Sequence, residues 1–162
     1  STGAITVNSS GANAVQVITP NATALLTCIL LTGTTAASWA VTDMTTLASG
    51  VYTPTLTNAA NLDGSTAYEC QYMRVGNTVT VSGQVDMDAT LTATNTQLYV
   101  TLPIASALAA LTDLGGTAAG LGTASLSAAI YAETSAGRAV IQYISIPTAN
   151  ASWFFSFTYQ II

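Results

Sequence analysis

Polar and apolar residues alternate most regularly between Thr78 and Met87. A strict period of two is typical of a β-strand that buries one face. The apolar positions are Val79, Val81, Gly83, Val85 and Met87. The preceding run, Tyr68–Val75, also alternates, and Gly76-Asn77 lies between the two runs. Two residues that tolerate positive φ between alternating runs predict a tight antiparallel β-hairpin.

The end of the sequence, from Trp153 to Gln160, shows the second clear alternation. One parity is aromatic and the other is mostly polar. The aromatic positions are Trp153, Phe155, Phe157 and Tyr159, and the other parity holds Phe154, Ser156, Thr158 and Gln160. Large aromatic side chains contribute strongly to cores. We therefore expect a strand whose aromatic face anchors the core.

Weaker patterns predict further strands and one short helical segment. The predicted strands are Val51–Leu56, Gln97–Leu102, Ser125–Tyr131 and Arg138–Ser145. Pro54 interrupts the first of these, which suggests an edge strand. The alanine-rich stretch Ala105–Leu114 favours helix, but Gly115-Gly116 follows it. We expect at most one or two helical turns there.

The first part of the chain differs from the rest in the length of its strand-like runs and in its scarcity of aromatic residues. Its short strand-like runs are Ile5–Val7, Val15–Ile18 and Leu25–Leu31, and no aromatic residue precedes Trp39. We place a boundary near Ala48–Gly50. Residues 1–48 are predicted to form an N-terminal β arm or subdomain that could serve for docking. Residues 49–162, with regular turn signals, are predicted to form an antiparallel, jelly-roll-like β-sandwich, so the fold class is all-β.

The charge inventory is very small. Only 6% of the 162 residues are charged, with no Lys and no His, and the cations are Arg74 and Arg138. A typical soluble domain is about 25% charged. The surface must therefore be rich in Thr, Ser, Asn, Gln and Ala, which cost far less to bury than ions. This favours large protein–protein contacts, and the alternative is an ordinary neutral extracellular module.

The same inventory excludes two classes of partner. Nucleic-acid binding needs clustered Lys or Arg against phosphate, and binding to an anionic membrane needs the same. The chain has neither, and its net charge is −5. We therefore expect no nucleic-acid and no membrane partner.

Catalytic chemistry lacks its usual groups. A nucleophilic triad needs a base, and neither His nor Lys is present. Asp86 and Asp88 are the closest pair of carboxylates, and we interpret them as a solvated strand end rather than a glycosidase pair or a calcium site. Cys28 and Cys70 do not form a zinc motif. We predict no enzyme activity, no metal and no cofactor.

Five residues are candidates for binding. Arg74 and Arg138 are each expected to pair with an acid, within the chain or across a subunit interface, where Arg is favoured. By strand position, the partners are Glu69 and Glu133. The alternative is an exposed arginine with no fixed partner. A glycan could stack on aromatic rings, and the candidates are Tyr99, Tyr131 and Tyr143. Core packing is the alternative use of each ring.

Neither cysteine chemistry nor targeting changes this interpretation. Cys28 and Cys70 are expected as buried free thiols, with a Cys28–Cys70 disulfide as the alternative. The segment STGAITVNSS lacks the basic end and apolar core of a signal peptide. The apolar stretch Ala24–Leu31 is far shorter than the roughly 20 residues that span a bilayer.

From Gly50 onward the sequence resembles a module of tailed-bacteriophage virion proteins. The segments that carry the resemblance are GVYTPTLTN (50–58), STAYECQYMRVGNTVTVSGQVDMD (65–88), QLYVTLPIAS (97–106) and WFFSFTYQII (153–162). In such proteins the module is a terminal β-domain on fibres or other surface parts of the particle. The resemblance implies a virion structural role and assembly in the host cytoplasm. It implies no catalytic or receptor-binding residue.

Three functions fit these observations. The first is a capsid decoration (cement) protein, a homotrimer that contacts other virion proteins such as the major capsid protein; closed symmetric assembly suits such a surface. The second is the receptor-binding tip of a tail fibre or spike, with a glycan receptor. The third is a bacterial surface or pilus-like module. We expect a virion location for the first two.

Overall fold

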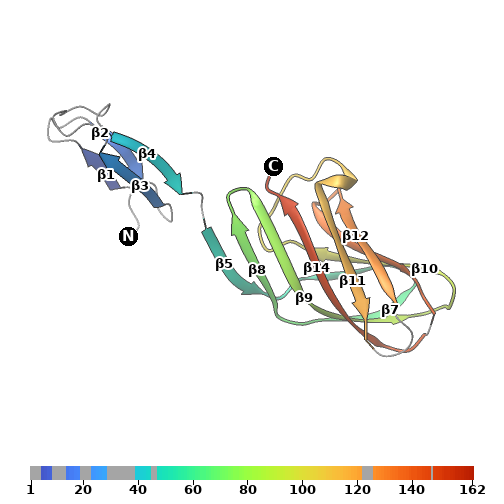
Figure 1. The fold of residues 1–162 in the computed structure, drawn as a ribbon. Coiled ribbons are helices and arrows are strands. Elements are labelled where there is room, and N and C mark those ends of the chain that lie inside the picture. The colour runs from blue at the N-terminus through green and yellow to red at the C-terminus, as the bar shows by residue number, and fades with distance from the viewer. Residues whose placement is uncertain are drawn as a thin grey trace. The chain divides into compact units, whose positions relative to one another are not determined.

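A computed structural model describes residues 5–8, 14–18, 23–28, 39–44, 47–121, 126–146 and 148–162. The chain divides into two compact units, Ser1–Ala48 and Ser49–Ile162. Strands dominate the described residues, and the one helical element among them is a single 3₁₀ turn (Figure 1). The prediction of an all-β fold is therefore confirmed.

The first unit contains two antiparallel strand pairs. Strand β1 (Ile5–Asn8) pairs with β2 (Ala14–Ile18), and β3 (Thr23–Cys28) pairs with β4 (Trp39–Met44). The strand-like runs in the sequence indicated the first three strands but not β4. Its sequence, WAVTDM, places polar residues next to each other, so the period of two is lost there.

The remaining strands form one antiparallel sheet of ten strands, with the 3₁₀ turn η2 between β10 and β11. They are β5 (Leu47–Tyr52), β6 (Leu56–Ala60), β7 (Leu62–Ala67), β8 (Cys70–Val75), β9 (Thr78–Ala89), β10 (Asn95–Thr101), η2 (Leu111–Asp113), β11 (Leu114–Gly120), β12 (Ser127–Glu133), β13 (Arg138–Ile144) and β14 (Ala151–Gln160).

The sheet curls back on itself. Its order is β5-β8-β9-β14-β11-β12-β13-β10-β6, and β7 pairs with β9. The first half of β9 pairs with β8 and its second half with β7. Strand β6, which leads directly into β7, pairs with β10 at the other end of the order. The continuous β6–β7 segment thus bridges β10 and β9, which lie near opposite ends of the strand order, and the result is the sandwich-like fold that was expected.

A bend at Asn61 makes this closure possible. Asn61 has a positive φ of 54°, which Asn tolerates better than most residues. Its side-chain amide donates to the Thr96 hydroxyl at 2.7 Å and to the Ser145 hydroxyl at 3.2 Å. Its side-chain oxygen accepts from the backbone N–H of Leu91 at 2.8 Å. Because Thr96 and Ser145 are fully buried, these bonds satisfy groups that water cannot reach.

The core lies between the inward faces of the curled sheet. The aromatic face of β14 is buried as predicted, and so are the apolar positions of β9. Strands β9 and β14 pair over ten positions, so their buried side chains lie side by side on the inward face of the sheet. Burying each of these large side chains contributes about 1.5–3 kcal/mol before the entropy cost.

Gly83 lies on the apolar face of β9 but has no side chain to contribute to the core. A Cβ at this position would lie 2.2 Å from the Cys70 sulfur. The missing side chain therefore makes room for Cys70, which is a buried free thiol. The side chain of Cys28 lies outside what the structure describes.

The local predictions are mostly confirmed, with one correction. Gly76 has a positive φ of 61° in the turn between β8 and β9. Only Leu111–Asp113 of the alanine-rich stretch is helical. The predicted strand Val51–Leu56 was wrong as a single element, because β5 ends at Tyr52 and β6 begins at Leu56. Pro54 lies in the break and has no N–H to donate to a ladder.

No helix among the described residues is long and apolar enough to cross a membrane.

Candidate functional site

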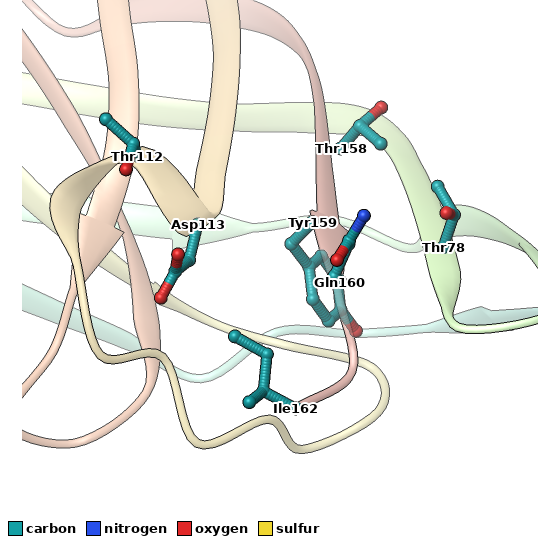
Figure 2. A pocket seen from close by; sticks show the side chains of 7 residues that line it. All are labelled: Thr78, Thr112, Asp113, Thr158, Tyr159, Gln160 and Ile162. Atoms are coloured by element: carbon teal, nitrogen blue, oxygen red, sulfur yellow. The ribbon is translucent and has the colours of Figure 1, made fainter.

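A pocket of about 380 Å³ opens where strand β9 begins and strand β14 ends; we call it the Asp113 pocket (Figure 2). Hydroxyl, amide and carboxylate groups make up most of its lining. The lining residues are Thr78, Thr112, Asp113, Thr158, Tyr159, Gln160 and Ile162.

Strand pairing brings these distant residues together. Gln160 pairs with Thr78 across β14 and β9, so both lie at the same end of the sheet. Leu114 pairs with Tyr159 on the other side of β14, which places the preceding residue, Asp113, beside the same strand end. Figure 2 shows Thr112 and Asp113 on one side of the pocket and Thr78, Thr158 and Gln160 on the other.

Tyr159 fixes the wall of the pocket to the loop before η2. Its ring is buried, and its hydroxyl donates to the Ile104 carbonyl at 2.7 Å while accepting from the Ile104 N–H at 3.2 Å. Burial is the main reason that the pKa of Tyr159 is raised to about 12. The phenol therefore stays protonated at neutral pH and acts as a rigid structural group.

Two hydrogen bonds of Ser106 hold the last residues against the same loop. The Ser106 hydroxyl donates to the Gln160 carbonyl at 2.7 Å and accepts from the Ile162 N–H at 3.0 Å. Ile162, whose backbone N–H is held in this way, is 62% exposed and contributes an apolar side chain to the pocket lining.

Only one of the two carboxylate oxygens of Asp113 accepts hydrogen bonds from the described part of the chain. Its Oδ2 atom accepts from the N–H groups of Ala109 and Ala110 at 2.7 and 2.8 Å, which orders the turn. Among the described residues, neither Asp113 Oδ1 nor the side-chain amide of Gln160 makes a hydrogen bond. The pocket therefore presents a carboxylate oxygen and an amide that a ligand could use.

A second polar group lies on the outward side of β10, β12 and β13, and we call it the Tyr–Arg cluster. Its members are Gln97, Tyr99, Tyr131, Glu133, Arg138 and Gln142. The guanidinium carbon of Arg138 lies 4.5 Å from the centroid of the Tyr99 ring, a cation–π contact. Arg138 Nε donates to Glu133 Oε2 at 3.0 Å, so the expected Arg138–Glu133 pair is confirmed.

The Tyr–Arg cluster uses most of its hydrogen-bonding groups internally. The Tyr131 hydroxyl donates to Gln142 Oε1, and Gln97 Nε2 donates to the Tyr131 hydroxyl at 3.2 Å and to Gln142 Oε1 at 3.0 Å. Burial, with the neighbouring Tyr99, raises the pKa of Tyr131. A ligand would have to displace bonds already made, so this cluster offers less to a ligand than the Asp113 pocket.

Two other residues proposed from the sequence, Tyr143 and Arg74, make contacts that stabilise the fold. Tyr143 is only 7% exposed, and its ring lies 4.3 Å from that of Trp153. The suggestion that a glycan stacks on Tyr143 was therefore wrong, because the ring is in the core. Arg74 Nε donates to the Gly76 carbonyl at 2.6 Å and so stabilises the β8–β9 turn. An interface role for Arg74 and Arg138, and glycan stacking on Tyr99 and Tyr131, stay predictions.

Asp86, one of the two carboxylates singled out on β9, is held by side-chain hydrogen bonds. Asp86 accepts from the Tyr68 hydroxyl at 2.8 Å and from the Gln84 amide at 3.2 Å. Burial raises the pKa of Asp86, but hydrogen bonds from Tyr68, Ser152 and Gln84 outweigh it, so the pKa lies below its usual value. Within the described part of the chain, no three His, Cys, Asp or Glu side chains gather to hold a metal.

Strands β8, β9, β14, β11 and β12 lie side by side in the sheet (Figure 1). An uncharged row of residues crosses their outward face. It consists of Gln71, Ser82, Ser156, Thr117 and Ala129. Phe154, 48% exposed, stands beside this row between two shallow hollows of about 420 Å³ each. We call this surface the Phe154 face. Glu69 is its one charged residue among those that line the hollows.

Sequence reasoning did not identify the Asp113 pocket. Alternation did predict that Thr158 and Gln160 point away from the aromatic core. Nothing local indicated that Asp113 lies beside them, because this depends on the pairing of β11 with β14.

No protein-family model matches the chain, and no curated protein matches it. Among solved structures, the fold is similar to that of the reovirus attachment protein sigma1, crystallised in complex with alpha-2,3-sialyllactose. The TM-score is 0.54 at 13% sequence identity, and the match covers 99% of this chain and 87% of that chain. At this identity the likeness shows a shared fold.

Proposed function

We propose that this chain is a non-catalytic attachment module on the surface of a virus particle and that it binds a carbohydrate of the host cell. The observation that carries the proposal is the fold match to a viral attachment protein, which extends over 99% of this chain and 87% of the other. The match includes both compact units rather than one common sheet motif.

The chemistry of the chain supports binding rather than catalysis. The sequence has no His and no Lys to act as a base. Hydroxyls and amides, which suit the hydroxyl groups of sugars, line the Asp113 pocket instead. The resemblance of residues 50–162 to phage virion modules supports a tailed bacteriophage as the virus.

We further propose that the module works as a homo-oligomer, with a trimer favoured. The Phe154 face supports this, since it combines an exposed aromatic ring with small uncharged neighbours that lose little hydration energy on burial. Closed rings of identical subunits are a common use of such faces.

Capsid decoration is the second candidate function. The Phe154 face favours it as well, because the same surface could dock on a capsid protein instead of on another copy. This alternative needs no carbohydrate ligand.

Two measurements test the proposal. Gold-labelled antibody against the chain should mark a few sites at the tail of the particle by electron microscopy. The purified chain should compete with particles for adsorption to host cells, and periodate oxidation of the cell-surface sugars should remove the competition. Label spread across the whole capsid, with no competition for adsorption, would overturn the attachment function in favour of decoration.

A further inference from the structure

The polar groups of the Asp113 pocket are arranged as a set of unused hydrogen-bonding partners. Asp113 Oδ1 and the Gln160 amide make no hydrogen bond among the described residues, although their neighbours are firmly held. Thr78 and Thr112 add exposed hydroxyls. Since the backbone around the pocket is fixed by Tyr159, Ser106 and the Asp113 turn, a ligand would meet these groups without large ordering costs.

The size of the pocket limits the ligand. A volume of about 380 Å³ lies at the lower end of the range of small-molecule sites, roughly 300–1,000 Å³. It suits one monosaccharide unit better than an extended oligosaccharide. The exposed Ile162 side chain offers an apolar surface for the C–H side of a sugar ring.

The charge of the pocket further restricts the class of ligand that it can bind. Asp113 carries the one carboxylate side chain in the lining, and neither arginine belongs to the lining. With a net charge of −5 the chain also repels anions at longer range. A carboxylate such as that of sialic acid would meet Asp113 with no cation among the lining residues. Two adjacent hydroxyl groups of a neutral sugar, in contrast, can donate to the carboxylate of Asp113 and accept from the side-chain amide of Gln160.

We infer that the Asp113 pocket binds a neutral monosaccharide unit of a glycan through adjacent hydroxyl groups and excludes sialic acid. This inference rests on the proposed attachment function and names the site and the ligand class. The ligand class differs from the sialyllactose of the sigma1 structure, because charge at the site, not fold, sets this preference.

The test is a titration of the full chain, ¹⁵N-labelled, with methyl α-D-glucoside, methyl α-D-galactoside, methyl α-D-mannoside and N-acetylneuraminic acid, each followed by amide chemical shifts. We expect at least one neutral glycoside to shift the signals of Thr112–Asp113 and Thr158–Ile162. N-acetylneuraminic acid should leave these signals in place.

Three variants make the result specific. Gln160→Ala should weaken binding about three- to tenfold, because one or two hydrogen bonds are lost. Asp113→Asn should weaken it by a similar factor and reduce the exclusion of N-acetylneuraminic acid. Asn95→Ala removes an exposed side-chain amide on β10 outside the pocket, so it is the matched control and should bind as the unaltered chain does. Equal melting temperatures would show that all three fold.

The possible failures are distinguishable. If a neutral glycoside binds but Gln160→Ala and Asp113→Asn bind it equally well, the pocket assignment is wrong and the attachment function stands. Preferential binding of N-acetylneuraminic acid overturns the charge argument alone. If no sugar shifts any signal and the chain does not compete for adsorption, the inference and the proposed function both fall.

Discussion

The side-chain amide of Asn61 donates to the hydroxyl of Thr96 at 2.7 Å, and this contact joins the bend between β6 and β7 to strand β10. Thr96 is completely buried, so its hydroxyl has no access to water. The bend lets one continuous segment pair with β10 on one side and with β9 on the other. A single polar side chain therefore stabilises the closure of the whole curled sheet.

Replacing Asn61 by Ala is expected to lower the free energy of unfolding by about 2–4 kcal/mol, because buried hydroxyls lose their donor and the positive φ becomes strained. Urea denaturation of the two proteins measures the difference. Asn95→Ala, at an exposed position of β10, is the control and should change stability by less than about 0.5 kcal/mol. Equal stability of Asn61→Ala and the unaltered chain would contradict the role assigned to the bend.

Gly83→Ala tests the packing against Cys70. The new Cβ would lie 2.2 Å from the sulfur, so Phe155, Cys70 or the backbone must move. We expect a loss of about 1–3 kcal/mol, typical of overpacking in a core. Removing the sulfur by Cys70→Ala should restore part of that loss in the double variant.

Gly64→Ala provides the matched control for Gly83→Ala. No atom lies within 4 Å of the Cβ that this change would add. Its effect on urea denaturation should stay within about 0.5 kcal/mol. An equal loss at both glycines would show that chain entropy or strand propensity, rather than the contact with Cys70, decides the effect.

Glu133 should make stability depend on pH in the acid range. The hydrogen bond from the Ser135 hydroxyl, followed by that from Arg138, outweighs burial and lowers the pKa of Glu133. A carboxyl group whose pKa is lower in the folded state stabilises the fold above its unfolded pKa of about 4.3. That contribution is lost as pH falls through the folded pKa.

Measuring the free energy of unfolding of the unaltered chain and of Glu133→Gln between pH 7 and pH 2 tests this. The unaltered chain should be the more stable at pH 7, and the gap should close toward pH 2. A gap that is independent of pH would mean that the shape of the side chain, and not its ionisation, matters.

Ser156→Glu tests the Phe154 face as a contact between subunits. The change puts a negative charge beside Phe154 and into the uncharged row. If copies of the chain associate through this face, the charge should dissociate them, because a buried unpaired carboxylate is very costly. Sedimentation velocity measures the oligomeric state.

Thr92→Glu, in the exposed turn between β9 and β10, adds the same charge elsewhere and should leave the oligomer intact. Dissociation by both changes would indicate general charge repulsion. An unaltered chain that sediments as a monomer would rule out self-association through this face.

Much of the second unit could be predicted locally. The faces of β9 and β14 followed from the period of two, because successive side chains of a strand point to opposite sides. The turn at Gly76 followed from the need for positive φ. Strand β13 was harder to interpret, since Ala139, Val140 and Ile141 are all buried and hide the alternation. This is why the sequence alone could not place the ring of Tyr143 in the core.

The sequence by itself determined the all-β class, the core faces of two strands and the lack of basic catalytic groups, since each depends on residue type or on neighbours within a few positions. Only the tertiary structure decided the closure at Asn61, the placement of Arg138 over Tyr99 and the meeting of Asp113 with Gln160. These relationships depend on which strands pair and in which register, and the pairing energy is spread over the whole core rather than written in any short segment.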